Sequence, residues 1–413
     1  MLIFDITSVV LLSVLLFWSV YNGTIIYAGI RRKRNPSPSN EIIGEFPKFS
    51  IIVPTKNEEA VVGRCLSGLL DLDYPRDKME IIIVDGNSSD STVRICSDFS
   101  AKYPMVFKII NENGCKGKPA ALNLALPHVT GDVVGVFDAD SLPEREVLKK
   151  VAAYLNDKNV TAVQGRTTSL NEKTNILTRV AASEEKAWFQ ALLLGREKLH
   201  LFVPLNGSCQ FVRREVLEEL GGWDEACLTE DVELAVRLVE KNHQVKYAPD
   251  VSAGQETPTG LRDLIKQRVR WYRGYMDVAL KYGRLLDKLN MKNLDAEISL
   301  AGPFMMVVSL LSYINWFFIV VFLSESSPII NFTGLVIALT AVSLFSVGIA
   351  LTASEKPIKL RNLLWVPSIY VYWLLQMCIA GWAFLKLVFR RKKVWSKTVK
   401  KGFITPNPIS NSI

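Results

Sequence analysis

The chain has 413 residues, more than one ordinary domain holds, and 49% of them are hydrophobic. Its net charge of +8 would suit a nucleic-acid partner, but the basic residues cluster as RRKR (31–34) and RRKK (390–393). Each cluster adjoins a long apolar segment, which is typical of charges that flank a membrane span. We therefore expect membrane lipids as partners, and no nucleic acid.

The cysteines and histidines predict neither disulfides nor zinc. The six cysteines include no CxxC pair, and the three histidines lie far apart. These patterns favour reduced thiols and exclude the usual zinc-ligand spacings.

Residues 3–30 are apolar over more than the roughly 20 residues that a membrane helix needs. The positive charge follows this segment, whereas a cleaved signal peptide carries it in front. The positive-inside rule then places the N-terminus outside and residue 31 onward in the cytosol. The alternative is a buried core helix. A linker rich in Pro, Ser and Asn follows.

Residues 48–290 have the composition of a soluble α/β domain. Strand-like apolar runs at 49–55, 79–86 and 132–140 alternate with helical patterns at 60–72 and 91–103. This alternation predicts parallel βαβ units with both faces of the sheet covered. Ligands of such sheets bind beyond the carboxyl ends of the strands, where Asp85, Asp138 and Asp140 fall.

Apolar segments return at 298–323, 329–353 and 363–389. The basic loop 354–362 is expected in the cytosol, so one pass through 363–389 would place RRKK outside, against the rule. We expect Pro367 to break this segment into an interfacial piece and a shorter or re-entrant piece, with a cytosolic C-terminus. The whole pattern predicts a multi-pass protein of the cell membrane with a cytosolic catalytic domain.

The triplet Asp138-Ala139-Asp140 ends the third strand-like run. Strand side chains alternate, so both carboxylates would project to the same side, roughly 6.5–7 Å apart along the chain. Two such carboxylates favour an oxygen-liganded cation, Mg²⁺ or Mn²⁺. The alternative is that they are turn or cap residues.

Several motifs in a fixed order carry a family resemblance. They are IIVPTKNEE (51–59), IIIVDGNSSDST (81–92), GKPAALN (117–123), FDAD (137–140), LTEDVELAVRL (228–238) and QRVRW (267–271). Over residues 48–275 the chain resembles the family 2 inverting glycosyltransferases, most closely the membrane-embedded cellulose, hyaluronan and poly-N-acetylglucosamine synthases. QRVRW fits the QxxRW signature of processive members, and VWSKTVKKG (394–402) is similar to a tail of the last group. The resemblance implies an α/β GT-A domain inserted between transmembrane helices.

The resemblance also implies roles for residues at the strand ends. The donor nucleotide-sugar would contact Pro54, Glu58, Asp85, Lys118, Asp138 and Arg270, and the metal would bind Asp140 and Asp138. Asp85 has a helix-capping alternative, and Lys118 an alternative as a surface lysine.

Glu230 and Asp231 begin a predicted amphipathic helix, with Thr229 as a plausible N-cap. Acidic residues are common at this place because they complement the helix dipole. The resemblance makes Asp231 the general base, with Glu230 beside it, and we expect the dipole to keep Asp231 ionised.

Residues 260–282 form a second predicted amphipathic helix, on which Gln267, Arg270 and Trp271 share one face. The resemblance assigns Arg270 to the diphosphate, and Gln267 and Trp271 to the acceptor sugar. A basic helix lying on lipid headgroups would show a similar pattern.

These observations predict six segments and a reaction. The segments are an N-terminal transmembrane helix (1–30), a linker (31–47), a GT-A domain (48–259), a QxxRW interfacial region (260–295), a transmembrane bundle (296–389) and a basic cytosolic tail (390–413). The predicted function is processive transfer from a nucleotide-sugar, with UDP as the favoured nucleotide, to a growing polysaccharide that is exported. Alternatives are a transferase that adds one sugar to a lipid-linked acceptor, and a non-catalytic membrane protein with a nucleotide-binding domain.

Overall fold

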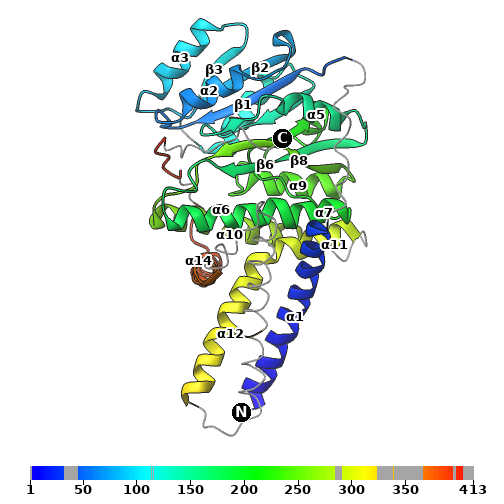
Figure 1. The fold of residues 1–413 in the computed structure, drawn as a ribbon, viewed down its shortest axis with the longest axis vertical. Coiled ribbons are helices and arrows are strands. Elements are labelled where there is room, and N and C mark those ends of the chain that lie inside the picture. The colour runs from blue at the N-terminus through cyan, green and yellow to red at the C-terminus, as the bar shows by residue number, and fades with distance from the viewer. Residues whose placement is uncertain are drawn as a thin grey trace.

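One eight-stranded sheet, in the order β3-β2-β1-β4-β7-β6-β8-β5, organises the computed structural model (Figure 1). The structure describes residues 2–31, 45–112, 114, 116–283, 291–322, 338, 366–393 and 397–402. The strands are β1 (Phe49–Thr55), β2 (Met79–Asp85), β3 (Phe107–Asn111), β4 (Val133–Val136), β5 (Leu142–Pro143), β6 (Val160–Ser169), β7 (Gln210–Arg213) and β8 (Gln244–Gln255).

The first half of the sheet is parallel, as predicted. β1 pairs in parallel with β2 and β4, and β2 pairs in parallel with β3. The second half is mixed: β7 runs antiparallel to β4 and β6, β5 runs antiparallel to β8, and β6 and β8 are parallel. The apolar runs of the sequence did not predict this half.

Helices cover both faces of the sheet because its strands are apolar on both sides. Ile51 and Val53 of β1 pack with helices α2 (Val62–Leu70), α3 (Thr92–Lys102) and α5 (Val147–Leu155). Ile52, between them, packs on the opposite face with α4 (Lys118–Ala125) and α9 (Glu230–Glu240). Three short helices complete this domain: η1 (Arg76–Lys78), η2 (Leu126–His128) and α8 (Arg214–Glu219).

A layer of helices lies between the sheet and the apolar helices. It holds α6 (Ile176–Ala187), the π-helical turn η3 (Trp188–Leu193), α7 (Leu194–Lys198) and α10 (Leu261–Tyr282) (Figure 1). α10 approaches α9 closely at Gly274, where a Cβ would lie 2.4 Å from Cγ2 of Thr229. This glycine therefore brings the QxxRW helix against the start of α9.

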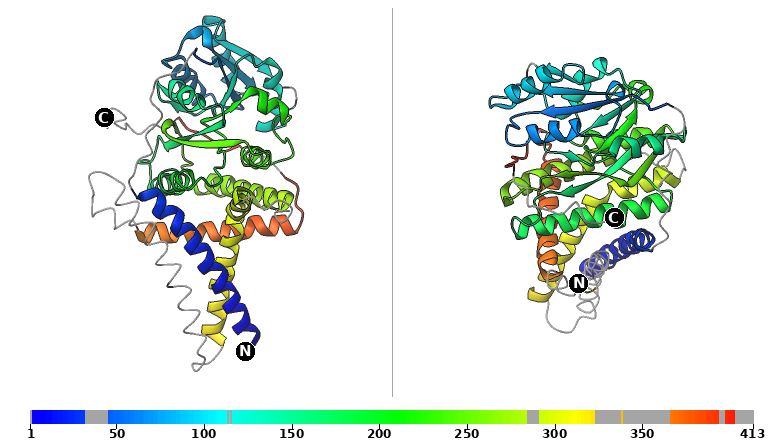
Figure 2. Two further views of the ribbon diagram at one scale, coloured as in Figure 1. Left: turned by 90° about the vertical axis from the view of Figure 1, so that its right-hand side faces the viewer. Right: turned by 45° about the horizontal axis from the view of Figure 1, so that its top comes forward.

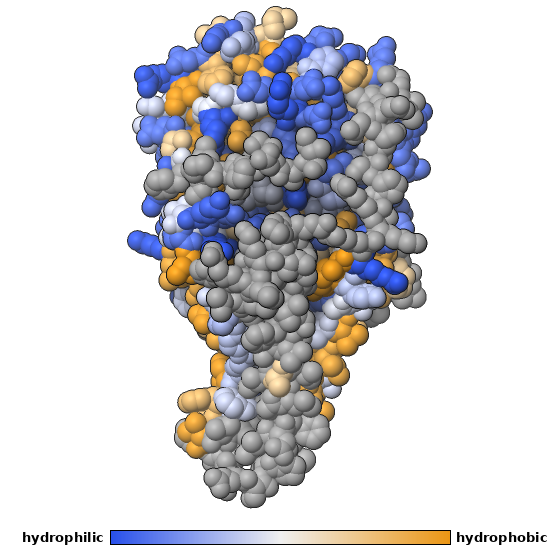
Figure 3. Space-filling model, viewed as in Figure 1, coloured by the Kyte–Doolittle hydropathy of each residue, from blue (hydrophilic) through white to orange (hydrophobic). Residues whose placement is uncertain are grey.

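Two apolar helices leave the domain side by side, α1 (Leu2–Ile30) and α12 (Gly302–Phe322), with α11 (Met291–Leu300) before α12 (Figures 1 and 2). Apolar side chains cover their outer surface (Figure 3). Residues 6–30 and 367–388 are long and apolar enough to cross a membrane, and the pair α11–α12, bent by 47°, is a third candidate. Apart from residue 338, the predicted span 329–353 lies outside the described residues.

Helix α14 (Val366–Val388) crosses α12 beneath the catalytic domain and does not run alongside it (Figure 2). The crossing is close at Gly381, where a Cβ would lie 2.8 Å from Cδ2 of Leu310. The expectation that Pro367 breaks this segment is wrong. Pro367 lies in the first turn of α14, where a helix needs no N–H donor and tolerates proline.

Candidate active site

Asp138 and Asp140 lie in the loop that follows β4, because β4 ends at Val136. The prediction that strand alternation orients both carboxylates is therefore wrong. Asp138 accepts from Lys118 Nζ through Oδ1 at 2.5 Å and from Gln255 Nε2 through Oδ2 at 3.2 Å. Asp140 accepts the Glu256 N–H through Oδ2 at 2.8 Å. Contacts from other elements, and not the pleat of a strand, orient the pair.

Lys118 is the first residue of α4, and its side chain is only 13% exposed, so the surface-lysine alternative is wrong. Its Nζ also donates to the Gly207 carbonyl at 2.7 Å and lies 3.9 Å from Glu230 Oε1. Burial would lower the pKa of Lys118, but Asp138 and then Glu230 outweigh it and raise that pKa. The ammonium thus links the Asp138 loop to the start of α9.

Asp138 stays ionised because three cations face it. Burial would raise its pKa, but Lys118, Lys400 and Arg270 together hold the pKa below its ordinary value. This carboxylate has the charge that binding a cation requires.

Asp231 has the opposite electrostatic setting. α9 begins at Glu230, and Thr229 occupies the N-cap position without a side-chain capping bond. Burial, and then the Glu230 carboxylate, raise the pKa of Asp231 to about 7, against the effect of Lys118. The N–H groups at the start of α9 lower this pKa, as expected, but burial outweighs them, so the expectation that they keep Asp231 ionised does not hold.

A glycine leaves room beside this carboxylate. Gly207 has φ +75°, and a Cβ there would lie 3.0 Å from Asp231 Oδ2 and 3.3 Å from Lys118 Nζ. Gly207 was not predicted as a site residue, because no signal in a single sequence marks it.

The C-terminal segment 397–402 returns to the strand ends. Lys397 Nζ lies 3.1 Å from Glu58 Oε1, and Lys400 Nζ lies 2.6 Å from Asp140 Oδ2. Burial raises the pKa of Glu58 to about 7, and its buried Oε2 has no hydrogen-bond partner within the described chain. In the sequence, this tail indicated only a resemblance to the poly-N-acetylglucosamine synthases. The contacts of Lys397 and Lys400 were not predicted.

The carboxylates fit a cation that is shared with a phosphate. The described residues contain no group of three or more His, Cys, Asp or Glu side chains placed to hold a metal. Asp138 and Asp140 supply two carboxylates, and Mg²⁺ commonly combines one or two carboxylates with substrate phosphates and water. Lys400 has to leave Asp140 Oδ2 before that oxygen can bind a cation.

Asp85 ends β2 and is only 2% exposed. Its Oδ2 accepts the Ser88 N–H at 2.8 Å, and its Oδ1 accepts from the hydroxyls of Ser88 at 2.5 Å and Thr55 at 3.2 Å. In this structure, the Asp85 carboxylate therefore stabilises the turn that follows β2. Pro54 lies in β1, opposite Val84 of β2.

On α10, the charge of Arg270 contributes to lowering the pKa of Asp138. Its buried Nε has no partner among the described residues, so it remains available to an anion. The Arg268 guanidinium lies over the Trp271 ring, 4.3 Å from the ring centroid, and covers one face of it. Gln267 is half-buried, one turn before Trp271.

Comparisons with known proteins identify the family and the fold. A protein-family model described as "Glycosyltransferase like family 2" matches residues 47–274. The chain is 30% identical over 371 residues to the beta-monoglucosyldiacylglycerol synthase of Trichormus variabilis, which covers 88% of this chain and 78% of that protein. It is 24% identical over 403 residues to the poly-beta-1,6-N-acetyl-D-glucosamine synthase of Staphylococcus epidermidis, covering 91% and 92%.

Among solved structures, the mannosyltransferase PcManGT from Pyrobaculum calidifontis, in complex with GDP-Man and Mn²⁺, has a similar fold. The TM-score is 0.69 at 21% identity, and the match covers 94% of this chain and 100% of that one. Together with the family match, this likeness shows that the mixed sheet and its helices form a GT-A fold.

Proposed function

Because this chain belongs to the family 2 glycosyltransferases, we propose that it transfers a sugar from a nucleotide-sugar, with UDP as the favoured nucleotide, with inversion at the anomeric carbon. The observation that carries the proposal is the meeting of Lys118, Asp138, Glu230 and Asp231 at the strand ends. Single displacement needs a base on one side of the reacting carbon and a charged site for the leaving diphosphate on the other.

Asp231 is the proposed base. A general base works best when its pKa lies near the operating pH, and Asp231 has a pKa of about 7. The space that Gly207 leaves open beside its Oδ2 gives room for an acceptor hydroxyl. Asp231 would take the proton of this hydroxyl as the hydroxyl oxygen attacks the anomeric carbon.

The leaving diphosphate would be stabilised by Arg270, whose Nε has no partner within the described chain. Planar guanidinium groups suit phosphate oxygens better than ammonium groups do. Asp138 and Asp140 would hold Mg²⁺ or Mn²⁺, which when bound offsets negative charge on the phosphates. We further propose that Glu58 and Asp85 contact the nucleoside, which for Asp85 requires that it exchange bonds with Ser88.

We propose that the catalytic domain lies in the cytosol of a multi-pass membrane protein. The support is the apolar surface of α1 and α12, together with the basic residues 390–393 at the end of α14. Because α14 crosses α12, we propose that it lies near the membrane surface, with residues 390–393 on the side of the domain (Figure 2).

For the acceptor, we propose a growing polysaccharide, so that transfer is processive and coupled to export. The support is the QxxRW helix, which lies against the start of α9 and carries Trp271. The uncovered face of an indole ring can stack on successive pyranose rings. A second candidate is the addition of one sugar to a lipid, favoured by the 30% identity to a beta-monoglucosyldiacylglycerol synthase over 88% of the chain.

One experiment tests both levels of this proposal. Membranes containing the chain are incubated with a panel of sugar nucleotides, with and without Mg²⁺ or Mn²⁺, and release of the nucleoside diphosphate is measured. Release that equals that of the Asp231→Asn control would contradict the transferase mechanism. With donor limiting and acceptor in excess, long products support the polymer, and one sugar per diacylglycerol supports the second candidate.

A further inference from the structure

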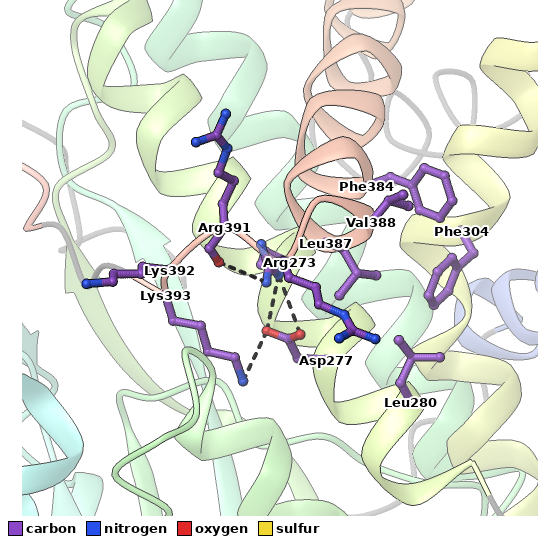
Figure 4. Close-up of a pocket in the computed structure, with 11 residues that line it drawn as sticks. Arg273, Asp277, Leu280, Phe304, Phe384, Leu387, Val388, Arg391, Lys392 and Lys393 are labelled. Atoms are coloured by element: carbon purple, nitrogen blue, oxygen red, sulfur yellow. Dashed lines mark hydrogen bonds and ion pairs between the residues drawn. The ribbon is translucent and has the colours of Figure 1, made fainter.

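A cavity of about 650 Å³ lies away from the catalytic carboxylates, between α10, α12 and the end of α14 (Figure 4). Its lining includes the apolar side chains of Leu280, Phe304, Phe384 and Leu387 and the basic side chains of residues 390–393. Figure 4 shows these apolar side chains on one side and those of Arg391, Lys392 and Lys393 on the other. A ligand that fills it must therefore be apolar at one end and anionic at the other.

The basic wall carries more positive charge than the protein neutralises. Asp277 is the one acid among the described lining residues, and it already pairs with Arg273 and Lys393, each at 3.4 Å. Arg390, Arg391 and Lys392 are exposed and have no carboxylate partner within the described ranges. Three uncompensated cations favour a ligand with net negative charge over a zwitterion.

The apolar wall is open to its surroundings. Leu280 is 65% exposed, and Val388, next to the cations, is 55% exposed. The cavity lies where α12 leaves the catalytic domain and turns an apolar surface outward (Figure 3). A soluble anion would leave this wall uncovered, whereas a lipid can cover it with an acyl chain.

We propose that this cavity binds an anionic glycerophospholipid. Its phosphate would lie against Arg390, Arg391 and Lys392, and its acyl chain would lie along Phe304, Phe384 and Leu387 toward α12. The bound lipid fixes the depth of α14 at the membrane surface. This site is independent of the sugar-transfer reaction, and its test does not depend on activity.

The test uses the full chain purified in a neutral detergent and measured by native mass spectrometry, which resolves single lipid adducts. We expect one tightly retained phosphatidylglycerol and no comparable retention of phosphatidylcholine. The triple variant Arg390→Gln, Arg391→Gln, Lys392→Gln should retain phosphatidylglycerol about 100-fold less, since each cation near an anionic lipid contributes roughly five-fold. Equal retention of both lipids, or full retention by this variant, would overturn the proposal.

Two controls separate this site from general charge attraction. The triple variant Arg94→Gln, Lys102→Gln, Lys158→Gln removes the same charge from exposed positions of the catalytic domain and should retain phosphatidylglycerol fully. Inorganic phosphate in large excess should not displace the lipid; displacement would show a site for free phosphate instead. If the first triple variant unfolds, the double variant Arg391→Gln, Lys392→Gln should still show about a 25-fold loss.

Discussion

The two sides of the proposed active site, one for the donor and one for the acceptor, contain the same kind of residue in opposite electrostatic states. On the donor side, Lys118, Lys400 and Arg270 hold the pKa of Asp138 low. On the acceptor side, burial and Glu230 raise the pKa of Asp231 to about 7. One carboxylate therefore stays charged and suits a cation, and the other can exchange a proton near neutral pH. Their different surroundings therefore suit the two carboxylates to different roles, as in other pairs of catalytic carboxylates.

The largest loss of turnover is expected from a substitution on the proposed donor side. Asp140→Asn removes one of the two carboxylates proposed to hold the metal, and we expect turnover to fall below detection. Diphosphate release across a titration of Mg²⁺ or Mn²⁺ measures it. A variant that keeps wild-type turnover and metal dependence would contradict this assignment. Asp73→Asn, which changes an exposed carboxylate that follows the C-terminal end of α2, is the matched control and should leave turnover unchanged.

A substitution on the proposed acceptor side should lower turnover less. Asp231→Asn removes the proposed base, and we expect kcat to fall by about 10²–10⁴-fold. Nucleotide binding should survive, because Asp231 is not among the residues assigned to the donor. Calorimetric titration with UDP checks this point, and loss of binding along with activity would make Asp231 a structural residue.

The two sides are joined by Lys118, and Lys118→Met should change both. Lys118 lowers the pKa of Asp231, so that pKa should rise in the variant. The base is active only when ionised, so the rise of kcat/KM with pH, centred near pH 7 in the wild type, should move to higher pH. A pH profile that stays in place would show that Lys118 does not act on Asp231.

The smallest expected effect is the reverse shift. Glu230 raises the pKa of Asp231, so Glu230→Gln should lower it and move the same rise of kcat/KM to lower pH. We expect the plateau above neutral pH to change far less than in the Lys118 variant. If the pH profile of kcat/KM were unchanged in both variants, the proposal that Lys118 and Glu230 set the pKa of Asp231 would be wrong.

The sequence anticipated the parallel half of the sheet well, because its strands are short, continuous apolar runs separated by helical patterns. β1 runs from Phe49 to Thr55, as predicted, and α10 begins within one residue of its predicted start. It did not anticipate β6, β7 and β8, whose pairing is set by crossovers and a β-bulge that no local pattern reveals. Likewise, the run 132–140 was predicted as a strand, but β4 ends at Val136.

The candidate site was likewise predicted only in part from the sequence. The types and order of Glu58, Asp138, Asp140, Asp231 and Arg270 were predicted from motifs. The four acids lie near strand ends or a helix start, and Arg270 lies within α10. Their partners were not. Lys400 is 260 residues from Asp140, and Gly207 is 24 residues from Asp231, so their contacts exist only after the chain has folded.

By itself, the sequence determined the apolar helices through local composition, and the family and the charged residues at the strand ends through the resemblance of its motifs. Only the tertiary structure decided the protonation of the two carboxylates. Burial and the distances to Lys118, Lys400 and Glu230 set their pKa values, and these quantities depend on segments far apart in the chain. The path of α14 across α12, with its close approach at Gly381, was likewise decided by packing and not by hydropathy, since residues 367–388 are apolar enough to cross a membrane.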